Sequence, residues 1–378
     1  MAIVVDRESF LSSLSLVQGI VERRNTVPIL GHVLIEPENT SIKLSATDLE
    51  VGISTEVTCK SAGEKSLTLN ARKLFEIVRE AASEEVSIAP LDKDWIELKC
   101  GRARFKMMGL DPRSFPAMPS QSAAQKESPR RGVKVALKIA ANVLAGMIDK
   151  TIFAVSPDEA RYNLSGVFLE SFEPGKARMV ATDGHRLAMV DREVPGFAME
   201  AGVIIPRKGL GELRKLLDQG GDAEVSLVID GHLASLKRNT TEVSMRLVEG
   251  EFPDYRGVIP KQSKHIITVK RDELMSAIKR AEIFSNERYH GVKLALSAGE
   301  LTISSTSPEM GEATDTLDID YRGEEFAIGF NASYVLQVLG IIPAESEVAL
   351  GLSDEVSPGV IQMPSDTAFT YVVMPMRL

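Results

Sequence analysis

The stretch from Val180 to Val190, VATDGHRLAMV, holds the most suggestive chemical groups of the chain. Asp183 and His185 could work as an acid–base pair, which general acid–base catalysis requires. Neighbours at i and i+2 rarely converge on one substrate, however, and no nucleophile accompanies them. An Asp-Gly turn that joins two strands of a hairpin accounts for the same residues. Three interpretations therefore stay open: a catalytic pair, a binding surface and an ordinary hairpin.

The sequence contains none of the common signatures of enzymatic or metal chemistry. There is no Walker phosphate loop, no Cys-x-x-Cys, no H-E-x-x-H and no G-x-S-x-G nucleophile elbow. The five histidines are scattered one at a time, and the two cysteines, Cys59 and Cys100, are too few for a four-cysteine zinc site. We therefore expect no catalytic residue, no metal site and no cofactor.

Basic residues recur on predicted helices at a spacing that places them on one face. Arg72 and Arg79 lie seven residues apart in the helical pattern of residues 71–81, and therefore share a face. Such faces are either solvated or meet phosphates without reading bases. Aromatic residues make up only 5% of the chain, which favours duplex backbone over stacked single strands. The same spacing recurs in residues 206–218, in the pairs Arg207/Arg214 and Lys208/Lys215.

A threefold internal repeat must position these groups. Each copy has a glycine, two alternating strands joined by a turn, a threonine and a later helix start. The glycines lie 135 and 125 residues apart, the threonines 135 and 124, and the helix starts 135 and 125. Three independent anchors with nearly equal offsets make chance similarity implausible. The anchors are Gly31, Gly166 and Gly291; Thr47, Thr182 and Thr306; and Ala71, Pro206 and Asn331.

Each copy reads as a strand, an amphipathic helix, several strands, a second helix and several more strands. This pattern predicts an α+β fold with the two helices on one side and β-sheets on the other. Polar segments that contain proline separate the copies. We expect three domains at residues 1–122, 132–253 and 264–378, joined by linkers at 123–131 and 254–263.

The chain is apolar up to its final residues, Met374 to Leu378. Met245-Arg246-Leu247 ends the last strand predicted for the second copy, and Met376-Arg377-Leu378 has the same letters. We therefore expect the third copy to end with a core strand that reaches Leu378.

The composition is that of a soluble globular protein, with 44% hydrophobic and 26% charged residues. No apolar stretch approaches the roughly 18–20 residues of a membrane span, and the N-terminus lacks the plan of a signal peptide. With only two cysteines, we expect a cytoplasmic, reducing location. The net charge of −9 argues against indiscriminate nucleic-acid binding by the whole surface but permits a local basic face.

With the repeat, the TDGHRL loop, FPDY, GFNASYV and the terminal YVVMPMRL in view, the chain resembles the bacterial DNA sliding clamps, the β subunits of DNA polymerase III. The resemblance covers essentially the whole chain. It implies three tandem DNA-clamp domains, and two copies that close head to tail into a six-domain ring with helices lining the hole. It further implies a processivity factor without catalytic activity, located in the cytoplasm at replication forks on the nucleoid.

The resemblance also assigns partners and sites. The partners are encircled duplex DNA without sequence preference, a second copy of the chain, the polymerase α subunit, the clamp loader, other polymerases, and repair and initiation-control proteins, with no membrane. Short peptides of these proteins would bind a pocket between the second and third domains, formed by Leu164, Thr182, Gly184, His185, Arg186, Leu187, Pro253, Val258, Asn331, Tyr334, Val372, Val373, Met374, Pro375, Met376, Arg377 and Leu378.

Two further sets follow from the same resemblance. The DNA-facing candidates are Arg24, Arg79, Arg102, Arg104, Tyr162, Arg207 and Lys208. The interface between copies would involve Lys73, Phe105, Ile283, Phe284, Glu309 and Glu312. Gly257 stands where family members commonly have arginine, so we expect one pocket wall to be wider. Asn163 stands where a second aromatic often follows the tyrosine at position 162.

Two other classes of function remain as alternatives to a DNA-encircling dimer. One is an enzyme that uses Asp183 and His185. The other is a repeat scaffold that binds peptides but not DNA.

Overall fold

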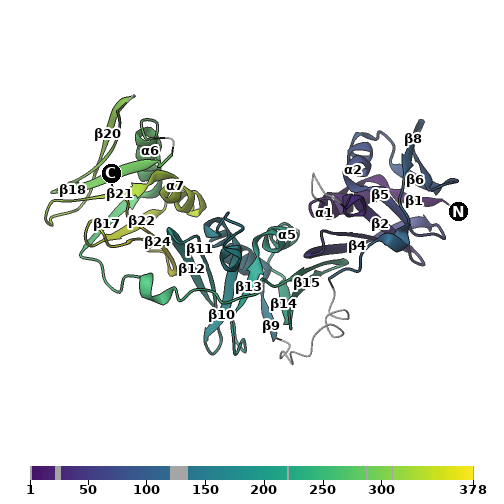
Figure 1. Ribbon diagram of the computed structural model, residues 1–378, viewed down its shortest axis with the longest axis horizontal. Helices are drawn as coiled ribbons and strands as arrows, with labels where there is room; N and C mark the ends of the chain where they lie inside the picture. Colours follow the sequence, from purple (N-terminus) through teal and green to yellow (C-terminus); the bar gives the residue numbers. More distant parts are fainter. Residues whose placement is uncertain are drawn as a thin grey trace. The chain divides into compact units, whose positions relative to one another are not determined.

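All three repeats follow one element order: strand, helix, four strands, helix, three strands (Figure 1). The computed structural model describes residues 2–21, 27–119, 135–218, 221–286, 288–308 and 310–377. The shared order confirms the α+β unit predicted from the sequence.

The first repeat comprises β1 (Ile3–Asp6), α1 (Arg7–Val17), β2 (His32–Pro37), β3 (Ser41–Thr47), β4 (Val51–Ala62), β5 (Leu67–Asn70), α2 (Ala71–Glu80), β6 (Glu85–Pro90), β7 (Trp95–Cys100) and β8 (Ala103–Met108). The second comprises β9 (Val135–Ala140), α4 (Ala141–Asp149), β10 (Gly166–Glu173), β11 (Lys176–Thr182), β12 (Arg186–Glu193), β13 (Val203–Pro206), α5 (Arg207–Leu217), β14 (Glu224–Asp230), β15 (Leu233–Arg238) and β16 (Thr241–Arg246). The third comprises β17 (His265–Lys270), α6 (Arg271–Glu282), β18 (Gly291–Ser297), β19 (Glu300–Ser307), β20 (Gly311–Asp318), β21 (Phe326–Asn331), α7 (Ala332–Ile341), β22 (Glu347–Leu352), β23 (Gly359–Met363) and β24 (Asp366–Val373). Short 3-10 turns are η1 (Pro28–Gly31), η2 (Pro112–Ser114), η3 (Ile152–Ala154), η4 (Tyr162–Leu164) and η5 (Arg256–Val258).

The chain forms two compact units, and the division passes through the second repeat. The first unit is Met1–Ala145 with Ile205–Leu247, and the second is Gly146–Ile204 with Val248–Leu378. The division falls there because each half of the second repeat shares a sheet with its neighbour.

In the first unit, one 12-stranded sheet joins strands of two repeats, with the main order β8-β7-β6-β1-β4-β16-β15-β14-β9. The joint is the antiparallel pair β4–β16, in which Val51 faces Met245 and Ile53 faces Val243. Helix α1 packs against α2, α5 and β4, so the helices of this unit share one side.

The second unit has an equivalent joint between β12 and β24, inside an eight-stranded sheet of order β13-β10-β11-β12-β24-β23-β22-β17. Arg186 faces Val373, and Ala188 faces Tyr371. A separate four-stranded sheet has the order β20-β19-β18-β21. Helix α6 packs on α7 and on this sheet, so the third repeat also keeps its helices together.

The helices form where capping and periodicity predict them. The side chains of Asp6, Asn70 and Asn331 accept backbone hydrogen bonds at the starts of α1, α2 and α7. The guanidinium groups of Arg7 and Arg271 donate to late carbonyls of α2 and α7. None of the described helices is long and apolar enough to cross a membrane. Three helices each bury an apolar stripe, namely Leu74 and Val78 on α2, Leu210, Leu213 and Leu217 on α5, and Leu274, Ile278 and Ala281 on α6.

The end of the chain differs from our expectation. Strand β24 stops at Val373, and the Met374 N–H donates to the His185 carbonyl oxygen at 2.8 Å. In the second repeat the Arg246 N–H donates to Glu50 in the same way. Met374 is therefore the equivalent of Arg246, and the expectation of a strand reaching Leu378 is wrong. The register between β12 and β24 depends on which side chains are buried, and not on the Met-Arg-Leu tripeptide that residues 245–247 and 376–378 share. Leu378 itself lies outside the described residues.

Leu49 is strained in the turn between β3 and β4. Its φ is +84°, close to the +89° of Gly184 at the equivalent turn of the second repeat. A left-handed backbone costs a leucine roughly 1–2 kcal/mol, and this side chain is half exposed, so little packing depends on it. We expect Leu49→Gly to stabilise the protein by about 0.5–1 kcal/mol, after the larger entropy of the unfolded glycine chain. Urea unfolding measures this. Leu91→Gly, at a half-exposed leucine of ordinary φ, should destabilise.

An ion cluster links the second and third repeats at the far end of the β12–β24 joint. The Asp366 carboxylate accepts hydrogen bonds from Lys150 and from Arg192, the latter at 2.7 Å. Partial burial raises the pKa of Asp366, but the two cations outweigh it, so the pKa lies below its ordinary value. A lowered pKa contributes stability above the ordinary carboxylate range, and this contribution disappears as pH falls through the folded-state pKa.

We therefore expect Asp366→Asn to lower stability at pH 7 by about 1–2 kcal/mol and to flatten the loss of stability below about pH 4. Chemical unfolding at several pH values measures both effects. Asp320→Asn is the control, since that side chain is almost fully exposed. Equal pH profiles for the wild type and Asp366→Asn would contradict the assignment.

Candidate functional site

A hollow of about 260 Å³ lies on the second unit beside the β12–β24 joint. Most of its lining belongs to the predicted peptide pocket: Leu164, Thr182, Gly184, Arg186, Leu187, Pro253, Val258, Val372 and Met374. Asp254 and Tyr255 complete it and were not predicted. Residues from η4, two strands of the second repeat, the 253–258 segment and the last strand thus converge on one cavity.

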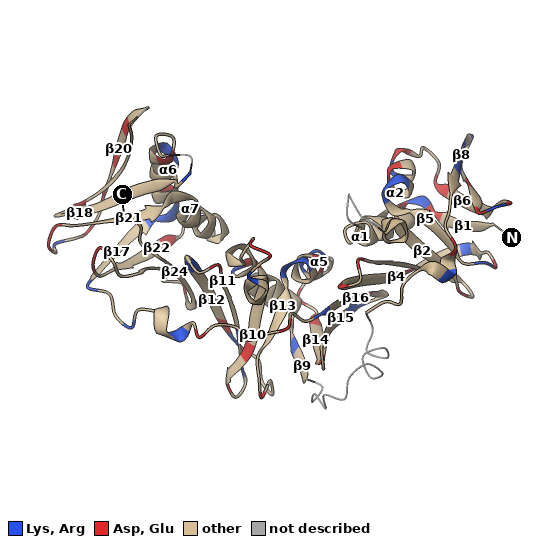
Figure 2. Ribbon diagram, in the orientation of Figure 1, with Lys and Arg blue, Asp and Glu red and all other residues tan. Residues whose placement is uncertain are grey.

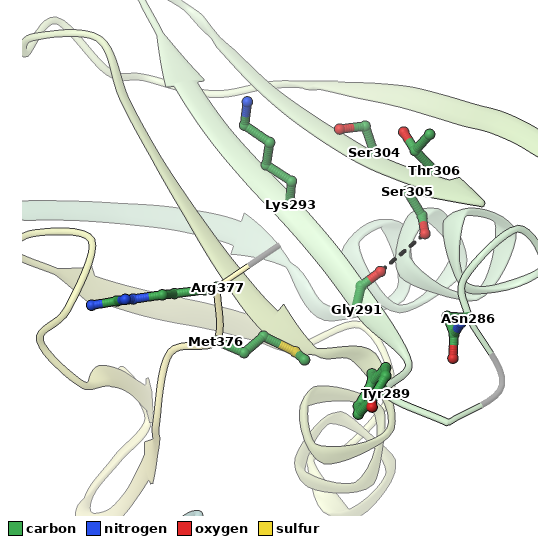
Figure 3. Close-up of a pocket in the computed structure, with 9 residues that line it drawn as sticks. All are labelled: Asn286, Tyr289, Gly291, Lys293, Ser304, Ser305, Thr306, Met376 and Arg377. Atoms are coloured by element: carbon green, nitrogen blue, oxygen red, sulfur yellow. Dashed lines mark hydrogen bonds between the residues drawn. The ribbon is translucent and has the colours of Figure 1, made fainter. Parts of the chain in front are cut away.

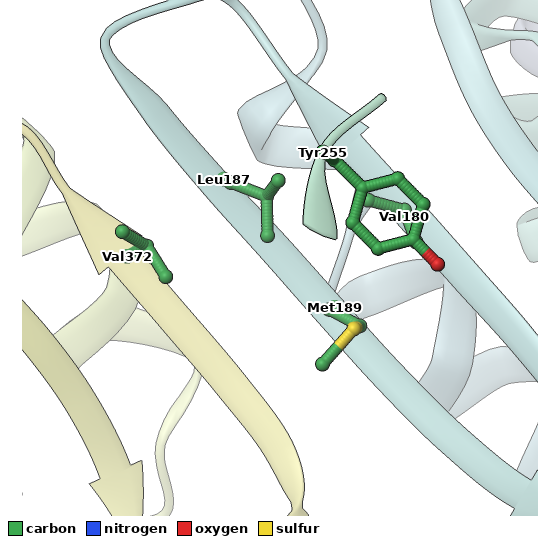
Figure 4. Close-up of a cluster of buried hydrophobic side chains, with 5 residues drawn as sticks. All are labelled: Val180, Leu187, Met189, Tyr255 and Val372. Atoms are coloured by element: carbon green, nitrogen blue, oxygen red, sulfur yellow. The ribbon is translucent and has the colours of Figure 1, made fainter. Parts of the chain in front are cut away.

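The hollow rests on a buried apolar cluster (Figure 4). Its members Val180, Leu187, Met189, Tyr255 and Val372 are all less than 10% exposed. Strand pairing assembles them, because Val180 faces Met189 across β11–β12 and Leu187 faces Val372 across β12–β24. The cluster gives the hollow a firm apolar floor, suited to aliphatic or aromatic anchors of a ligand.

The TDGHR segment is a hairpin turn with its polar groups satisfied. The Thr182 hydroxyl donates to the Arg186 carbonyl at 2.6 Å, and Gly184 has a φ of +89°. One carboxylate oxygen of Asp183 accepts the N–H groups of His185 and Arg186, and the other accepts Arg186 Nε at 3.0 Å. The carboxylate therefore serves the turn and Arg186, which favours a binding surface over a catalytic Asp–His pair.

Arg186 connects the turn to the third repeat. Its guanidinium donates to the Gln337 side chain on α7 and to the Phe153 carbonyl, both at 2.7 Å. It also lies 4.6 Å from the centroid of the Tyr334 ring. The side chains of Arg186 and Asp183 are only 6% and 7% exposed. A buried cation held by three hydrogen bonds fixes the rim of the hollow in one geometry.

The opposite wall, Pro253 to Val258, is held by Tyr255. The Tyr255 hydroxyl donates to Glu170 and accepts from Arg178, which forms a two-pronged ion pair with Asp191 at 2.6 and 2.7 Å. Burial, together with the Glu170 carboxylate, raises the pKa of Tyr255 to about 12, so the phenol stays protonated. The wall is thus pinned to β10 and β11 by a satisfied polar network.

Gly257 lies on η5, within the wall segment Pro253 to Val258. It does not line the hollow, and a Cβ placed there would meet no atom within 4 Å. The expectation that one wall is wider at Gly257 stays a prediction. Asn163, the other departure, donates its side-chain amide to the Glu251 carbonyl at 3.2 Å.

Of the remaining predicted pocket residues, those that the structure describes do not line the hollow. The rings of His185 and Tyr334 stack with centroids 6.4 Å apart, and Asn331 caps α7. Val373 is buried and Pro375 lies on the tail. Met376 and Arg377 line a different hollow.

The DNA-facing candidates lie on several elements. Arg79 on α2 and Arg207 on α5 are exposed, and Figure 2 shows basic segments on both helices. Lys208 forms an ion pair with Asp48, so part of its charge is already neutralised. Tyr162 is 60% exposed on η4. Arg102 lies in the turn before β8 and Arg104 on β8 itself, so neither is on a helix, and Arg24 is outside the described residues.

The interface candidates lie at two sheet edges. Phe105 is on β8 and Glu312 on β20, each the end strand of its sheet. Ile283, just after α6, is 69% exposed, its neighbour Phe284 is half-buried, and Lys73 on α2 bonds Glu76. Glu309 is outside the described residues. No group of three or more His, Cys, Asp or Glu side chains in the described part of the chain could hold a metal ion.

Family models match almost the whole chain. Residues 1–119 match the DNA polymerase III β subunit N-terminal domain, residues 138–254 its central domain, and residues 256–377 its C-terminal domain.

Relatives match over full length. A β sliding clamp of Pseudomonas aeruginosa is 37% identical over 381 residues, covering 100% of both chains, and one of Vibrio cholerae is 34% identical with the same coverage. The crystal structure of the P. aeruginosa clamp bound to griselimycin has a TM-score of 0.90 at 37% identity, covering 100% of both chains. The Thermotoga maritima β subunit has a TM-score of 0.89 at 28% identity, covering 100% of this chain and 99% of that one.

Proposed function

The chain belongs to the DNA polymerase III β-subunit family, the β sliding clamps, and on this premise we propose how it closes into a ring, meets DNA and holds its partners. Its function is that of a processivity factor in DNA replication, an accessory polymerase subunit without catalytic activity of its own. We assign its three clamp domains to residues 1–122, 132–253 and 264–378, with linkers at 123–131 and 254–263.

The observation that carries the ring is the repeated sheet joint. The fourth strand of one repeat pairs with the last strand of the next at β4–β16 and again at β12–β24. The strand of the third repeat equivalent to β4 and β12 is β20, and the strand of the first repeat equivalent to β16 and β24 is β8. Each of them is the end strand of its sheet and has no further partner among the described residues. A second copy can supply the missing pair twice, β8 to β20 and β20 to β8, which closes a head-to-tail dimer.

The internal joints also predict the register of this contact. Val51 and Gly311 are equivalent, because each is the first residue of the second strand of its hairpin, β3–β4 or β19–β20. Met245 and Met107 are also equivalent, because each is the second-to-last residue of the last strand of its repeat, β16 or β8. Transferring the β4–β16 pairing then sets Gly311 opposite Met107 and Ala313 opposite Phe105. Lys106 of one copy falls opposite Glu312 of the other, and opposite charges in such a pair stabilise it.

Exposed apolar side chains accompany both edges. Phe105 and Met108 on β8 are 37% and 50% exposed, and Ile283 and Met310 near β20 are 69% and 51% exposed. In the first repeat, Ile20, the equivalent of Phe284, is fully buried in the first unit. We assign Lys73, Phe105, Ile283, Phe284, Glu309 and Glu312 to the interface, where the apolar members are covered.

The DNA-facing surface is assigned to the helix side. Exposed cations on α2 and α5, among them Arg79 and Arg207, would meet phosphates of an enclosed duplex. Because the ring holds DNA by enclosure, these contacts can be weak enough to permit sliding. The proposed set of DNA-facing residues also includes Arg24, Arg102, Arg104, Tyr162 and Lys208. Lys208 should contribute less to phosphate binding than the others, because it already pairs with Asp48.

The hollow beside β12–β24 is the proposed docking site for partner peptides. Its apolar floor, its rigid rim at Arg186 and its methionine-bearing edge suit anchors of varied shape. Relatives of this family have been crystallised with griselimycin bound. The proposed partners are the polymerase α subunit, the clamp loader, other polymerases, and repair and initiation-control proteins, met in the cytoplasm at replication forks.

Two measurements test this function. Light scattering should give about twice 41.2 kDa, and primer extension on circular single-stranded template with DNA polymerase III and its clamp loader should yield long products only when the chain is present. A monomer at micromolar concentration, or products of unchanged length, would contradict it. A turnover lost in His185→Ala would favour the enzyme hypothesis, and stimulation of polymerase that survives Arg79→Glu with Arg207→Glu would favour the peptide scaffold.

A further inference from the structure

A second hollow, of about 560 Å³, lies on the third repeat under the end of the chain (Figure 3). It is lined by Asn286, Tyr289, Gly291, Lys293, Ser304, Ser305, Thr306, Met376 and Arg377. Figure 3 shows Met376 beside Tyr289 at one end and Lys293 beside Ser304 at the other. The hollow thus combines an apolar, aromatic end with a cationic, hydroxyl-bearing end.

The hollow is on the sheet side of the third repeat. Val292 and Leu294 are buried toward α6, and Lys293 between them points to the opposite face, as alternation along a strand requires. Ser304 lies directly across from Lys293 on β19. A duplex that meets the helix side therefore would not reach these groups.

The lining offers cations that are not paired within the described residues, whereas the Ser305 hydroxyl already donates to the Gly291 carbonyl. Lys293 and Arg377 form no ion pair there, although the chain as a whole has 53 acidic against 44 basic residues. Among the described residues, none that lines this hollow carries a side-chain carboxylate. Thr306 is exposed, whereas its equivalents Thr47 and Thr182 are buried and bond their own turns. A lysine, an arginine and hydroxyls around one space are the donor set that a carboxylate prefers.

The end of the chain links the two hollows. Met374 lines the first and Met376 the second, and two residues of extended chain span only about 7 Å. A peptide anchored in the first hollow therefore needs two or three further residues to cross the tail and enter the second.

We propose that the second hollow binds an acidic segment that flanks the apolar anchor of a partner peptide. The inference rests on the proposed peptide-docking function of the first hollow. The carboxylate lies between Lys293 and Arg377, and the residue beside it packs on Met376 and Tyr289. A partner with acidic residues next to its anchor is thereby distinguished from one without them.

Four fluorescein-labelled synthetic peptides test the proposal by anisotropy with the full chain. All share one leucine- and phenylalanine-containing pentapeptide, extended at either end by Asp-Glu or by Asn-Gln. At one end, the Asp-Glu peptide should bind about 3- to 20-fold more tightly than its Asn-Gln counterpart, the range expected of two partly exposed charge pairs. Added salt should reduce this difference.

Lys293→Gln should remove most of the acidic preference and leave the Asn-Gln peptides unchanged. Arg322→Gln, which removes an exposed cation of the same repeat outside both hollows, is the matched control and should keep the preference. If the acidic and amide peptides bind with equal affinity, this inference is wrong but the peptide-docking function is not affected. The same conclusion follows if Lys293→Gln and Arg322→Gln lose the preference for the acidic peptide equally. Failure of all four peptides to bind overturns the peptide-docking function as well. If Lys293→Gln instead weakens binding of duplex DNA by the same factor, the anion is phosphate and the proposal is wrong.

Discussion

Arg186→Ala is expected to lower the free energy of unfolding by about 3–5 kcal/mol, the usual cost of removing one partner from a buried ion pair. The guanidinium is 6% exposed and holds Asp183, Gln337 and the Phe153 carbonyl in place. Its removal leaves the Asp183 carboxylate buried without a cation and frees the rim of the peptide hollow. Peptide affinity should fall at least tenfold. Urea unfolding and peptide anisotropy measure the two effects.

The control for this prediction is the double variant Asp183→Asn with Arg186→Met. An asparagine oxygen can still accept the N–H groups of residues 185 and 186, and no charge is left buried. The double variant should therefore be more stable than Arg186→Ala while still binding peptide poorly. An Arg186→Ala protein within about 0.5 kcal/mol of the wild type would mean that the pair does not hold the hairpin.

Reversing either charge of the predicted pair Lys106–Glu312 should open the ring. Like charges placed opposite each other destabilise a strand pair, and each ring has two such contacts. We expect Lys106→Glu or Glu312→Lys to cost about 1–4 kcal/mol per ring, which raises the dimer dissociation constant about 5- to 700-fold. Sedimentation over a dilution series measures this.

Mixing the two single variants gives a sharper test of the head-to-tail arrangement. In a ring with one chain of each kind, the two substituted side chains face each other at one contact, as a glutamate opposite a lysine. The natural Lys106 faces the natural Glu312 at the other contact. Mixed dimers should therefore re-form, although Lys106→Glu also faces Glu97 within its own sheet. Thermal unfolding of each isolated variant controls for that internal effect. If mixing leaves both variants monomeric, the proposed register is wrong.

The repeated element order was predictable from the sequence because its signals are local. Gly31, Gly166 and Gly291 stand at or directly before the first residue of equivalent strands, and the apolar stripes of the helices follow a helical period. The joining of repeats into continuous sheets was not predictable, because β4 and β16 are about 190 residues apart and no local sequence pattern indicates that they pair. The end of β24 was mispredicted for the same reason, because matching letters at Met376 do not determine register.

The candidate site was predictable mainly through resemblance to a family. The turn at Asp183 and Gly184 could be read from its residue types, but the convergence of Leu164, Pro253 and Met374 depends on tertiary packing. Tyr255 was missed although FPDY is a conspicuous segment, because only the folded chain brings its hydroxyl to Glu170 and Arg178. The network around it depends on long-range contacts that no periodicity reveals.

The central claim is that two copies of the chain encircle duplex DNA, and topology tests it most directly. The clamp is loaded by its clamp loader onto nicked circular duplex, isolated by gel filtration at moderate salt, and divided before half is linearised. The account predicts that the protein stays with the circle, with a half-life of minutes or longer, and is lost within the dead time of the separation once the DNA has ends. Equal retention on circular and linear DNA would contradict it, because the protein would then be held by affinity and not by enclosure.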